Sequence, residues 1–232
     1  MYLFYAPDIE GEPFLTEEES AHAVRVMRLS QGEEIRLTNG KGMFYRAVIV
    51  RAHPKCCEVM VTEQFREAPQ WPVHIHIAIA PPKHIDRMEW FVEKATEIGV
   101  NAITCLNCRY SERKEIKTSR LEKIMIAAMK QSLKAQLPQL TGMIDFGDFI
   151  RQPFDAAKYI AYCAENENFA LKDSYQAGKN AVLLIGPEGD FSQEEIRLAI
   201  EYGFQPVSLG KSRLRTETAA LVACHTIHLL ND

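Results

Sequence analysis

Apolar and polar residues alternate in short runs over the first 70 residues, which is typical of β-strands. The clearest signal is the pair Asn39–Gly40, which separates the alternating runs Glu34–Thr38 and Met43–Ile49. An Asn-Gly pair favours a tight hairpin turn because both residues tolerate positive φ. We therefore predict a β-hairpin with Lys41 near its exposed tip and Tyr45 on its second strand.

A helix is predicted before this hairpin. Thr16 is followed three residues later by a glutamate, which is a capping-box pattern, and helical spacing continues to about Leu29. His22, Arg25 and Arg28 fall on one face of the predicted helix. Such a row of basic groups can hold a phosphate backbone, and it can equally be an ordinary solvated face.

The pattern breaks at residues 68–72, where two prolines within four residues interrupt both helix and strand. Beyond this linker, strand-like and helix-like runs alternate, which predicts a parallel sheet with helices on its faces. The run Val73–Ile79 predicts a half-buried strand, and Thr216–Leu230 predicts a last, broadly apolar helix. The pattern as a whole predicts an α/β chain with domains at residues 1–70 and 71–232.

Two glycine-containing loops fall where a predicted strand meets a predicted helix. The first spans residues 185–191, after the buried run Ala181–Leu184 and before a second capping box that starts at Ser192. The second spans residues 209–219. Junctions of this kind are where α/β proteins place ligands, and glycine lets the backbone approach a ligand closely. The loops predict a preformed pocket; the simpler interpretation of the first loop as a plain turn stays open.

The charges in the first loop indicate which ligand it takes. The chain contains neither Gly-Lys-Ser/Thr after a glycine-rich stretch nor G-x-G-x-x-G, the two common phosphate-binding patterns. Glu188 and Asp190 place carboxylates in or beside the loop, where they repel phosphates but suit ribose hydroxyls or a cation. S-adenosylmethionine has both of these groups and no phosphate, so the loop favours this methyl donor.

Four motifs, in order along the chain, resemble a known family. They are AHAVRVMRLSQGEEIRLTNGKGMFYRAVI, EKATEIGVNAI, IGPEGDFSQEEI and LGKSRLRTETAAL. Together they are similar to the RsmE family, small-subunit (16S) ribosomal RNA methyltransferases that act on the N3 position of a uridine. The resemblance covers almost the whole chain. It implies an N-terminal PUA-like β-barrel, a C-terminal SPOUT-type, trefoil-knotted parallel-sheet methyltransferase domain that binds S-adenosylmethionine, and a homodimer.

The resemblance and the charge pattern also indicate site residues. Those expected to enclose the methyl donor are Cys163, Ile185, Gly186, Pro187, Glu188, Gly189, Leu209, Gly210, Leu214 and Thr218. Those expected to contact RNA are Arg25, Arg28, Lys41, Tyr45, Lys83 and Arg109. Tyr45, beside basic groups, can stack on a base and can equally be a core residue.

The chain departs from the family pattern at two places. Lys130-Gln131-Ser132-Leu133-Lys134 stands where many members have Glu-Gln-Ser-Gly-Arg. The role of the arginine would fall to Lys134, which cannot make the same bidentate contact. Asp190 stands in place of a third glycine in the first loop.

Methyl transfer to a ring nitrogen needs an aligned sulfonium, loss of the imino proton and stabilisation of negative charge on the base. We predict that Arg215 stabilises this charge through preorganised, charge-assisted hydrogen bonds. Glu217 is the second predicted catalytic residue, and it orients Arg215 or accepts a proton. Its alternative role is that of an acidic residue in the first turn of the last helix. The loops contain no histidine to serve as a general base.

Overall charge and hydropathy limit the ways in which the chain can meet RNA. The formal net charge is −4, so attraction to RNA must come from local patches. Residues 21–51 carry six basic and two acidic side chains, and residues 109–134 carry eight basic and three acidic side chains.

No apolar run approaches the roughly 20 residues of a membrane helix, and the start lacks a basic signal segment. We expect a cytoplasmic protein without a membrane partner.

The residues that most often bind metals do not form a convincing site in this sequence. Cys105 and Cys108 form a single C-x-x-C without a second pair, and the six cysteines are expected to be reduced. His74 and His76 share a strand face, but no acidic or thiol partner is near them in sequence. We expect no metal.

Three classes of function compete. The paired loops and the resemblance favour an S-adenosylmethionine-dependent RNA methyltransferase whose partners are small-subunit ribosomal RNA, or the small subunit, and a second copy of the chain. The alternative is a non-catalytic RNA-binding or ribosome-assembly protein that keeps the pocket as structure. A nucleotide hydrolase is disfavoured by the carboxylates in the first loop and by the absence of a complete phosphate loop.

Overall fold

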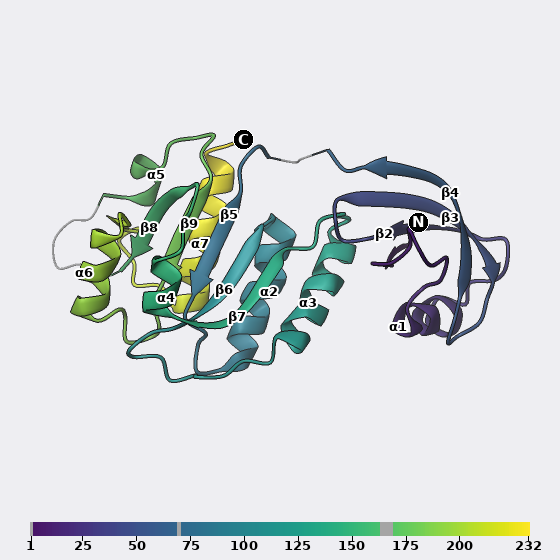
Figure 1. The fold of residues 1–232 in the computed structure, drawn as a ribbon, viewed down its shortest axis with the longest axis horizontal. Coiled ribbons are helices and arrows are strands. Elements are labelled where there is room, and N and C mark those ends of the chain that lie inside the picture. The colour runs from purple at the N-terminus through teal and green to yellow at the C-terminus, as the bar shows by residue number, and fades with distance from the viewer. Residues whose placement is uncertain (1, 69–70, 163–168) are drawn as a thin grey trace. The chain divides into compact units, whose positions relative to one another are not determined.

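The computed structural model describes residues 2–68, 71–162 and 169–232. The chain divides into two compact units (Figure 1). One unit comprises Met1–Pro69 with Ile126–Leu137, and the other comprises Gln70–Met125 with Pro138–Asp232.

The first unit is built on a four-stranded sheet in the order β1-β2-β3-β4. Its strands are β1 (Leu3–Tyr5), β2 (Glu34–Thr38), β3 (Met43–Arg51) and β4 (Glu58–Arg66). β1 and β2 are parallel and the other pairs are antiparallel. Phe14 bridges to Glu58, which extends the pairing beyond β4. The predicted hairpin is confirmed: residues 39–42, which begin with Asn39–Gly40, connect β2 to β3, and Gly40 has φ +74°.

The predicted helix before the hairpin is only partly correct. Thr16 caps α1 (Glu17–Ala21), and its Oγ1 accepts a hydrogen bond from the backbone N–H of Glu19. The chain then widens into a π-helix, η1 (His22–Val26), in which Met27 N donates to His22 O. Arg28, at φ +56°, lies beyond its end. The row of basic residues predicted on a regular helix is therefore wrong, because a π-turn changes the angular spacing of side chains.

The second unit contains a six-stranded sheet in the order β10-β8-β9-β5-β6-β7, and every pair in it is parallel. The strands are β5 (Ile75–Ile79), β6 (Ala102–Asn107), β7 (Gln139–Asp145), β8 (Ala157–Ala161), β9 (Ala181–Ile185) and β10 (Gln205–Val207). The helices are α2 (Ile85–Ile98), α3 (Thr118–Gln131), α4 (Phe146–Ile150), α5 (Leu171–Ser174), α6 (Gln193–Glu201) and α7 (Thr216–Leu229). The residues of α3 from Ile126 onward belong to the first unit. The predicted parallel sheet is confirmed, while the trefoil knot stays a prediction.

Helices cover both faces of this sheet. α2 packs on α7, which lies against β5 and β9, whereas α4 and α6 pack together on the opposite face (Figure 1). Ala78 and Ile79, on successive positions of β5, are both fully buried. The prediction of a half-buried strand at Val73–Ile79 is therefore wrong, because a central strand of a parallel sheet is covered on both sides.

All six strands run in the same direction, so the loops that leave their carboxyl ends meet at one edge of the sheet. Among the described residues, these are the loops after β5, β6, β7, β9 and β10, and they include both glycine loops. None of the described helices is long and apolar enough to cross a membrane.

Candidate functional site

The first glycine loop leaves β9 as a tight turn. A Cβ added at Gly186 would lie 3.1 Å from the ring of Phe191, so only glycine fits without displacing that side chain. Asp190 adopts φ +64°, and its Oδ1 accepts a hydrogen bond from Phe191 N at 2.8 Å. Aspartate tolerates the left-handed region better than most residues. This is how the chain accommodates an aspartate in place of a third glycine.

The turn is fixed at its far end by α6. Ser192 Oγ accepts from Glu195 N, and Glu195 Oε2 accepts from Ser192 N at 2.8 Å. The predicted capping box is confirmed, and it satisfies backbone donors that would otherwise be unpaired.

The second glycine loop connects β10 to α7. Gly210 has φ +127°, and its N–H donates to Ser208 Oγ at 3.2 Å. Leu209 and Leu214 are partly buried, and Arg215 is exposed immediately before α7. The loop therefore presents backbone groups and two apolar side chains beside a basic residue.

A hydrogen bond joins the two loops. Thr216 Oγ1, in the first turn of α7, donates to Gly186 O at 3.1 Å, and both residues are buried. A third segment approaches from the other side, because Lys83 N donates to Glu188 Oε1 at 3.0 Å. Three segments that are far apart in sequence thus meet at the carboxyl edge of the sheet.

The two predicted catalytic residues lie in different surroundings. Arg215 is exposed, whereas Glu217 is only 6% exposed. Glu217 pairs with Arg87, whose Nε lies 3.9 Å from Glu217 Oε1. Glu217 also stands in the first turn of α7, where a carboxylate is favoured by the helix dipole.

The other residues predicted for the donor site are distributed as follows. Ile185 and Pro187 are buried, Thr218 is partly buried on α7, and Gly189 is exposed. Cys163 lies outside the residues that the structure describes.

Among the residues predicted to contact RNA, Tyr45 needs correction. Its side chain is 2% exposed, and its hydroxyl donates to Glu10 Oε1 at 2.6 Å. Burial, together with the Glu10 carboxylate, raises the pKa of Tyr45 to about 12. The ring has no free face for a base, so Tyr45 is a core residue. The other five, Arg25, Arg28, Lys41, Lys83 and Arg109, are exposed.

The other departure from the family pattern, at residues 130–134, also falls at an unusual backbone position. Leu133, which stands where many members have glycine, adopts φ +55° and is 53% exposed. Lys130, three residues earlier, pairs with the buried Glu19 at 2.5 Å. This segment therefore has a structural role within the first unit.

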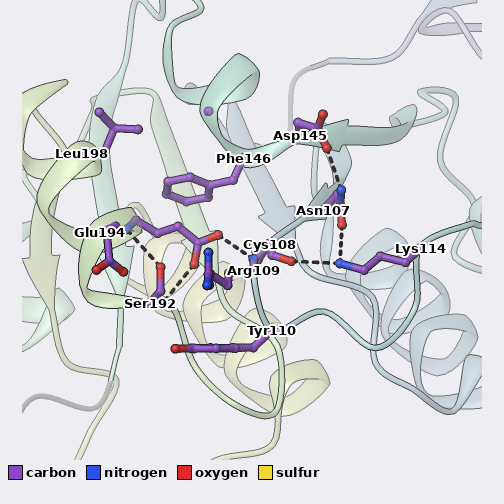
Figure 2. Close-up of a pocket in the computed structure, with 12 residues that line it drawn as sticks. Asn107, Cys108, Arg109, Tyr110, Lys114, Asp145, Phe146, Ser192, Glu194 and Leu198 are labelled. Carbon is purple, nitrogen blue, oxygen red and sulfur yellow. Dashed lines mark hydrogen bonds between the residues drawn. The ribbon is translucent and has the colours of Figure 1, made fainter.

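A pocket of about 690 Å³ lies beside the first loop, at the ends of β6 and β7 (Figure 2). Tyr110 forms part of its wall, and a Cβ added at Gly189 would lie 3.3 Å from Tyr110 Cβ. Its other lining residues are Asn107, Cys108, Arg109, Lys114, Asp145, Phe146, Gly147, Ser192, Glu194, Glu195 and Leu198. Of these, only Arg109 was expected at a site from the sequence. Asn107 and Asp145, polar residues at the ends of strands, were the signal available.

Hydrogen bonds fix the polar side of this pocket. Asn107 Nδ2 donates to Asp145 Oδ1 at 2.6 Å, and Lys114 Nζ donates to Asn107 Oδ1 at 3.0 Å (Figure 2). On the opposite side, Arg109 N donates to Glu195 Oε1 at 2.8 Å. The capping glutamate of α6 therefore also holds the loop that carries Arg109.

Of the residues considered as metal ligands, Cys105 and Cys108 are buried in the core, His76 is partly buried and His74 is exposed. Burial raises the pKa of Cys105 to about 12 and also raises the pKa of Cys108. Burial, together with nearby His74, lowers the pKa of His76 to about 4, and its Nε2 lies 2.8 Å from Thr104 Oγ1. Within the described part of the chain, no group of three His, Cys, Asp or Glu residues could hold a metal ion.

Comparisons with known families match both halves of the chain. Residues 69–228 match an RNA methyltransferase domain, and residues 15–59 match an RNA methyltransferase PUA domain. The ribosomal RNA small subunit methyltransferase E of Synechocystis sp. is 32% identical, over 98% of this chain and 77% of the relative. That of Bacillus subtilis is 26% identical, over 92% of this chain and 88% of the relative.

Solved structures are similar over the whole length. A probable rRNA-methyltransferase from Porphyromonas gingivalis is 47% identical, with a TM-score of 0.95 over 100% of this chain and 98% of that chain. A ribosomal RNA small subunit methyltransferase E from Neisseria gonorrhoeae, bound to S-adenosyl methionine, is 27% identical. Its TM-score is 0.86 over 99% of this chain and 98% of that chain.

Proposed function

Because this chain belongs to the RNA methyltransferase family, we propose that it transfers a methyl group from S-adenosylmethionine to N3 of a uridine in small-subunit ribosomal RNA. The observation that carries the proposal is the bond from Thr216 Oγ1 to Gly186 O, which brings the two glycine loops together. The relatives from Synechocystis and B. subtilis are named for the same reaction class, and the N. gonorrhoeae structure holds the donor.

The residues around these loops fit S-adenosylmethionine. Gly186 has no room for a side chain beside Phe191, so glycine keeps the loop in the tight turn against which we propose that the donor binds. Partly buried Leu209 and Leu214 offer apolar surfaces to adenine. The remaining proposed contacts are Ile185, Pro187, Glu188, Gly189, Gly210 and Thr218, together with Cys163. When bound, the donor supplies an electrophilic methyl group on a sulfonium.

Arg215 is the residue that we assign to the developing charge on the uracil ring. It is exposed at the junction of the second loop with α7, two residues before the buried Glu217. A fixed guanidinium stabilises an oxyanion in the transition state more than in the ground state, which is what accelerates a reaction. Since Glu217 is already paired with Arg87, its proposed part is to hold the start of α7, and with it Arg215, in place.

We assign a different role to each of the two predicted domains. We assign RNA binding to residues 1–70, through exposed Arg25, Arg28 and Lys41, and catalysis to residues 71–232, with Lys83 and Arg109 beside the loops. We also propose a homodimer, and the exposed Leu229 of α7, at 63% exposure, is a candidate for its interface. We also propose a cytoplasmic location, because the proposed substrate is ribosomal RNA.

Calorimetric titration of the full-length protein with S-adenosylmethionine, using ATP and NAD as comparison ligands, tests the donor site. We expect saturable binding of S-adenosylmethionine alone. Methyl transfer to unmodified small-subunit RNA, mapped to the modified base, then tests the reaction. Donor binding without any transfer to free RNA or to the small subunit would support the non-catalytic alternative.

A further inference from the structure

We propose that the 690 Å³ pocket beside the first glycine loop binds a nucleotide next to the target uridine, with its base stacked on Tyr110. This inference rests on the proposed function, because it takes single-stranded RNA as the substrate. It adds a binding site that is separate from the donor loops.

The position of the pocket is the first argument. Tyr110 lies against Gly189 of the donor loop, since a Cβ at Gly189 would be 3.3 Å from Tyr110 Cβ. Ser192, which follows the same loop, lines the pocket as well. The donor loop and the pocket thus share a wall, and an RNA strand that presents a base to the loop carries its neighbouring nucleotide past Tyr110.

The exposure of Tyr110 is the second argument. Tyr110 is 52% exposed, although it stands only two residues after the buried Cys108. Figure 2 shows its ring at the edge of the pocket, with Phe146 across from it. Phe146 is 4% exposed and packs on Phe191 at 5.5 Å, so it serves as a fixed wall. Exposed aromatic rings are the usual platforms for unpaired bases.

The polar side of the pocket suits the edge of a base. The chain Asp145–Asn107–Lys114 fixes the amide of Asn107, as its two hydrogen bonds show. Lys114 Nζ also donates to Cys108 O at 3.3 Å, which leaves one of its three ammonium hydrogens for a ligand. Asp145 has a second oxygen that can accept. This side of the pocket can therefore both donate hydrogen bonds to a base and accept them from it.

Charge decides against a ligand rich in phosphates. Arg109 and Lys114 are opposed by Asp145, Glu194 and Glu195, so the lining has one more acidic than basic residue. Both oxygens of Glu195 accept backbone hydrogen bonds, which ties its charge to Arg109 N and Ser192 N. A di- or triphosphate would be repelled, whereas one nucleotide of an RNA strand brings a single phosphate that the Arg109 side chain can meet.

The test replaces Tyr110 in the full-length protein. Tyr110→Ala is expected to raise the KM for small-subunit RNA about tenfold, because it removes one base–aromatic stack. Tyr110→Phe keeps the ring and is expected to restore the wild-type KM. Tyr202→Ala is the matched control, since Tyr202 is an exposed tyrosine of the same unit (39%) that does not line the pocket. Donor affinity, measured by calorimetry, is expected to be unchanged in all three variants.

A binding measurement separates this inference from the proposed function. A single-stranded oligouridylate with one central 2-aminopurine is titrated with each variant, and stacking on Tyr110 quenches its fluorescence. Quenching by wild type and Tyr110→Phe, but not by Tyr110→Ala, supports the pocket even if no methyl transfer is seen. Equal quenching by all variants, or an RNA KM unchanged in Tyr110→Ala, overturns it. Equal loss of donor affinity and RNA affinity in Tyr110→Ala also overturns it, because Tyr110 would then only support the donor loop.

Discussion

Two regions at the same edge of the parallel sheet are built in different ways. The loops after β9 and β10 are joined through main-chain groups, as the bond to Gly186 O shows, and their shape depends on glycines. The pocket after β6 and β7 is built from side chains, held by the chain Asp145–Asn107–Lys114. We infer that the first region recognises the methyl donor through backbone groups and shape. The second recognises a nucleotide of the RNA through polar side chains and stacking.

This difference predicts which substitutions each region tolerates. In the loops, adding a methyl group at Gly186 is expected to be harmful, whereas substitutions at exposed positions such as Arg213 are expected to be tolerated. In the pocket, removal of side chains is expected to weaken RNA binding without affecting the donor. The four predictions below test this separation, beginning with the largest effect.

Arg215→Ala is expected to lower the methylation rate at saturating substrates about 100-fold or more, because one charge-assisted donor to the developing oxyanion is lost. Donor affinity by calorimetry should stay close to that of wild type. Arg213→Ala, an exposed arginine in the same loop, is the control and should retain activity. A large loss of donor affinity in a folded Arg215→Ala variant would contradict this division of roles.

Gly186→Ala is expected to weaken donor binding about tenfold or more. The new methyl group would lie 3.1 Å from the ring of Phe191, and overpacking of this kind costs about 1–3 kcal/mol. Gly11→Ala is the control, because the nearest atom to its added Cβ is 3.9 Å away. Calorimetric titration measures the effect, and wild-type donor affinity in Gly186→Ala would show that the loop does not need its glycine.

Glu195→Ala is expected to lower the free energy of unfolding by about 0.5–2 kcal/mol, because the capping box of α6 loses one partner. It also frees Arg109 N, so the KM for RNA should rise while donor affinity stays the same. Urea unfolding and steady-state kinetics measure the two effects, with Gln193→Ala in the same helical turn as the control. A loss of donor affinity without a change in the KM for RNA would contradict the separation of the two regions into a donor site and an RNA site.

His76 lies on β5, between the strands that carry the two regions, and is expected to make stability pH-dependent. Burial lowers its pKa to about 4 in the folded protein, from 6.5. The unfolded chain therefore binds the proton first, and stability is expected to fall as pH drops from about 6.5 towards 4. His76→Phe should lose less stability between pH 7 and pH 4.5 than wild type, whereas His225→Phe, at an exposed position on α7, should match wild type. If the free energy of unfolding of His76→Phe and of wild type depended on pH in the same way, His76 would not be the cause of the pH dependence.

Some elements follow local rules and were predicted from the sequence. The Asn39–Gly40 hairpin, the N-cap at Thr16 and the capping box at Ser192 all depend on residues within a few positions of one another. The alternation of strand-like and helix-like runs likewise predicted the parallel sheet, although not its strand order. Other features depend on what packs against a residue. From the sequence alone, Tyr45 fits either a base-stacking residue or a core residue. Its burial and its hydrogen bond to Glu10, 35 residues away, show that it is a core residue. The π-turn at His22–Val26 leaves no mark in hydrophobic spacing.

For the site, the sequence by itself determined the two glycine loops, their carboxylates and their place at strand ends, because these are properties of contiguous residues. It also carried the family resemblance, which the comparisons confirm. Only the tertiary structure decided that Thr216 reaches Gly186, and that Tyr110, Asn107, Asp145 and Glu195 line one pocket. The physical reason is that strand order in a parallel sheet, β10-β8-β9-β5-β6-β7, brings together segments that periodicity along the chain cannot relate.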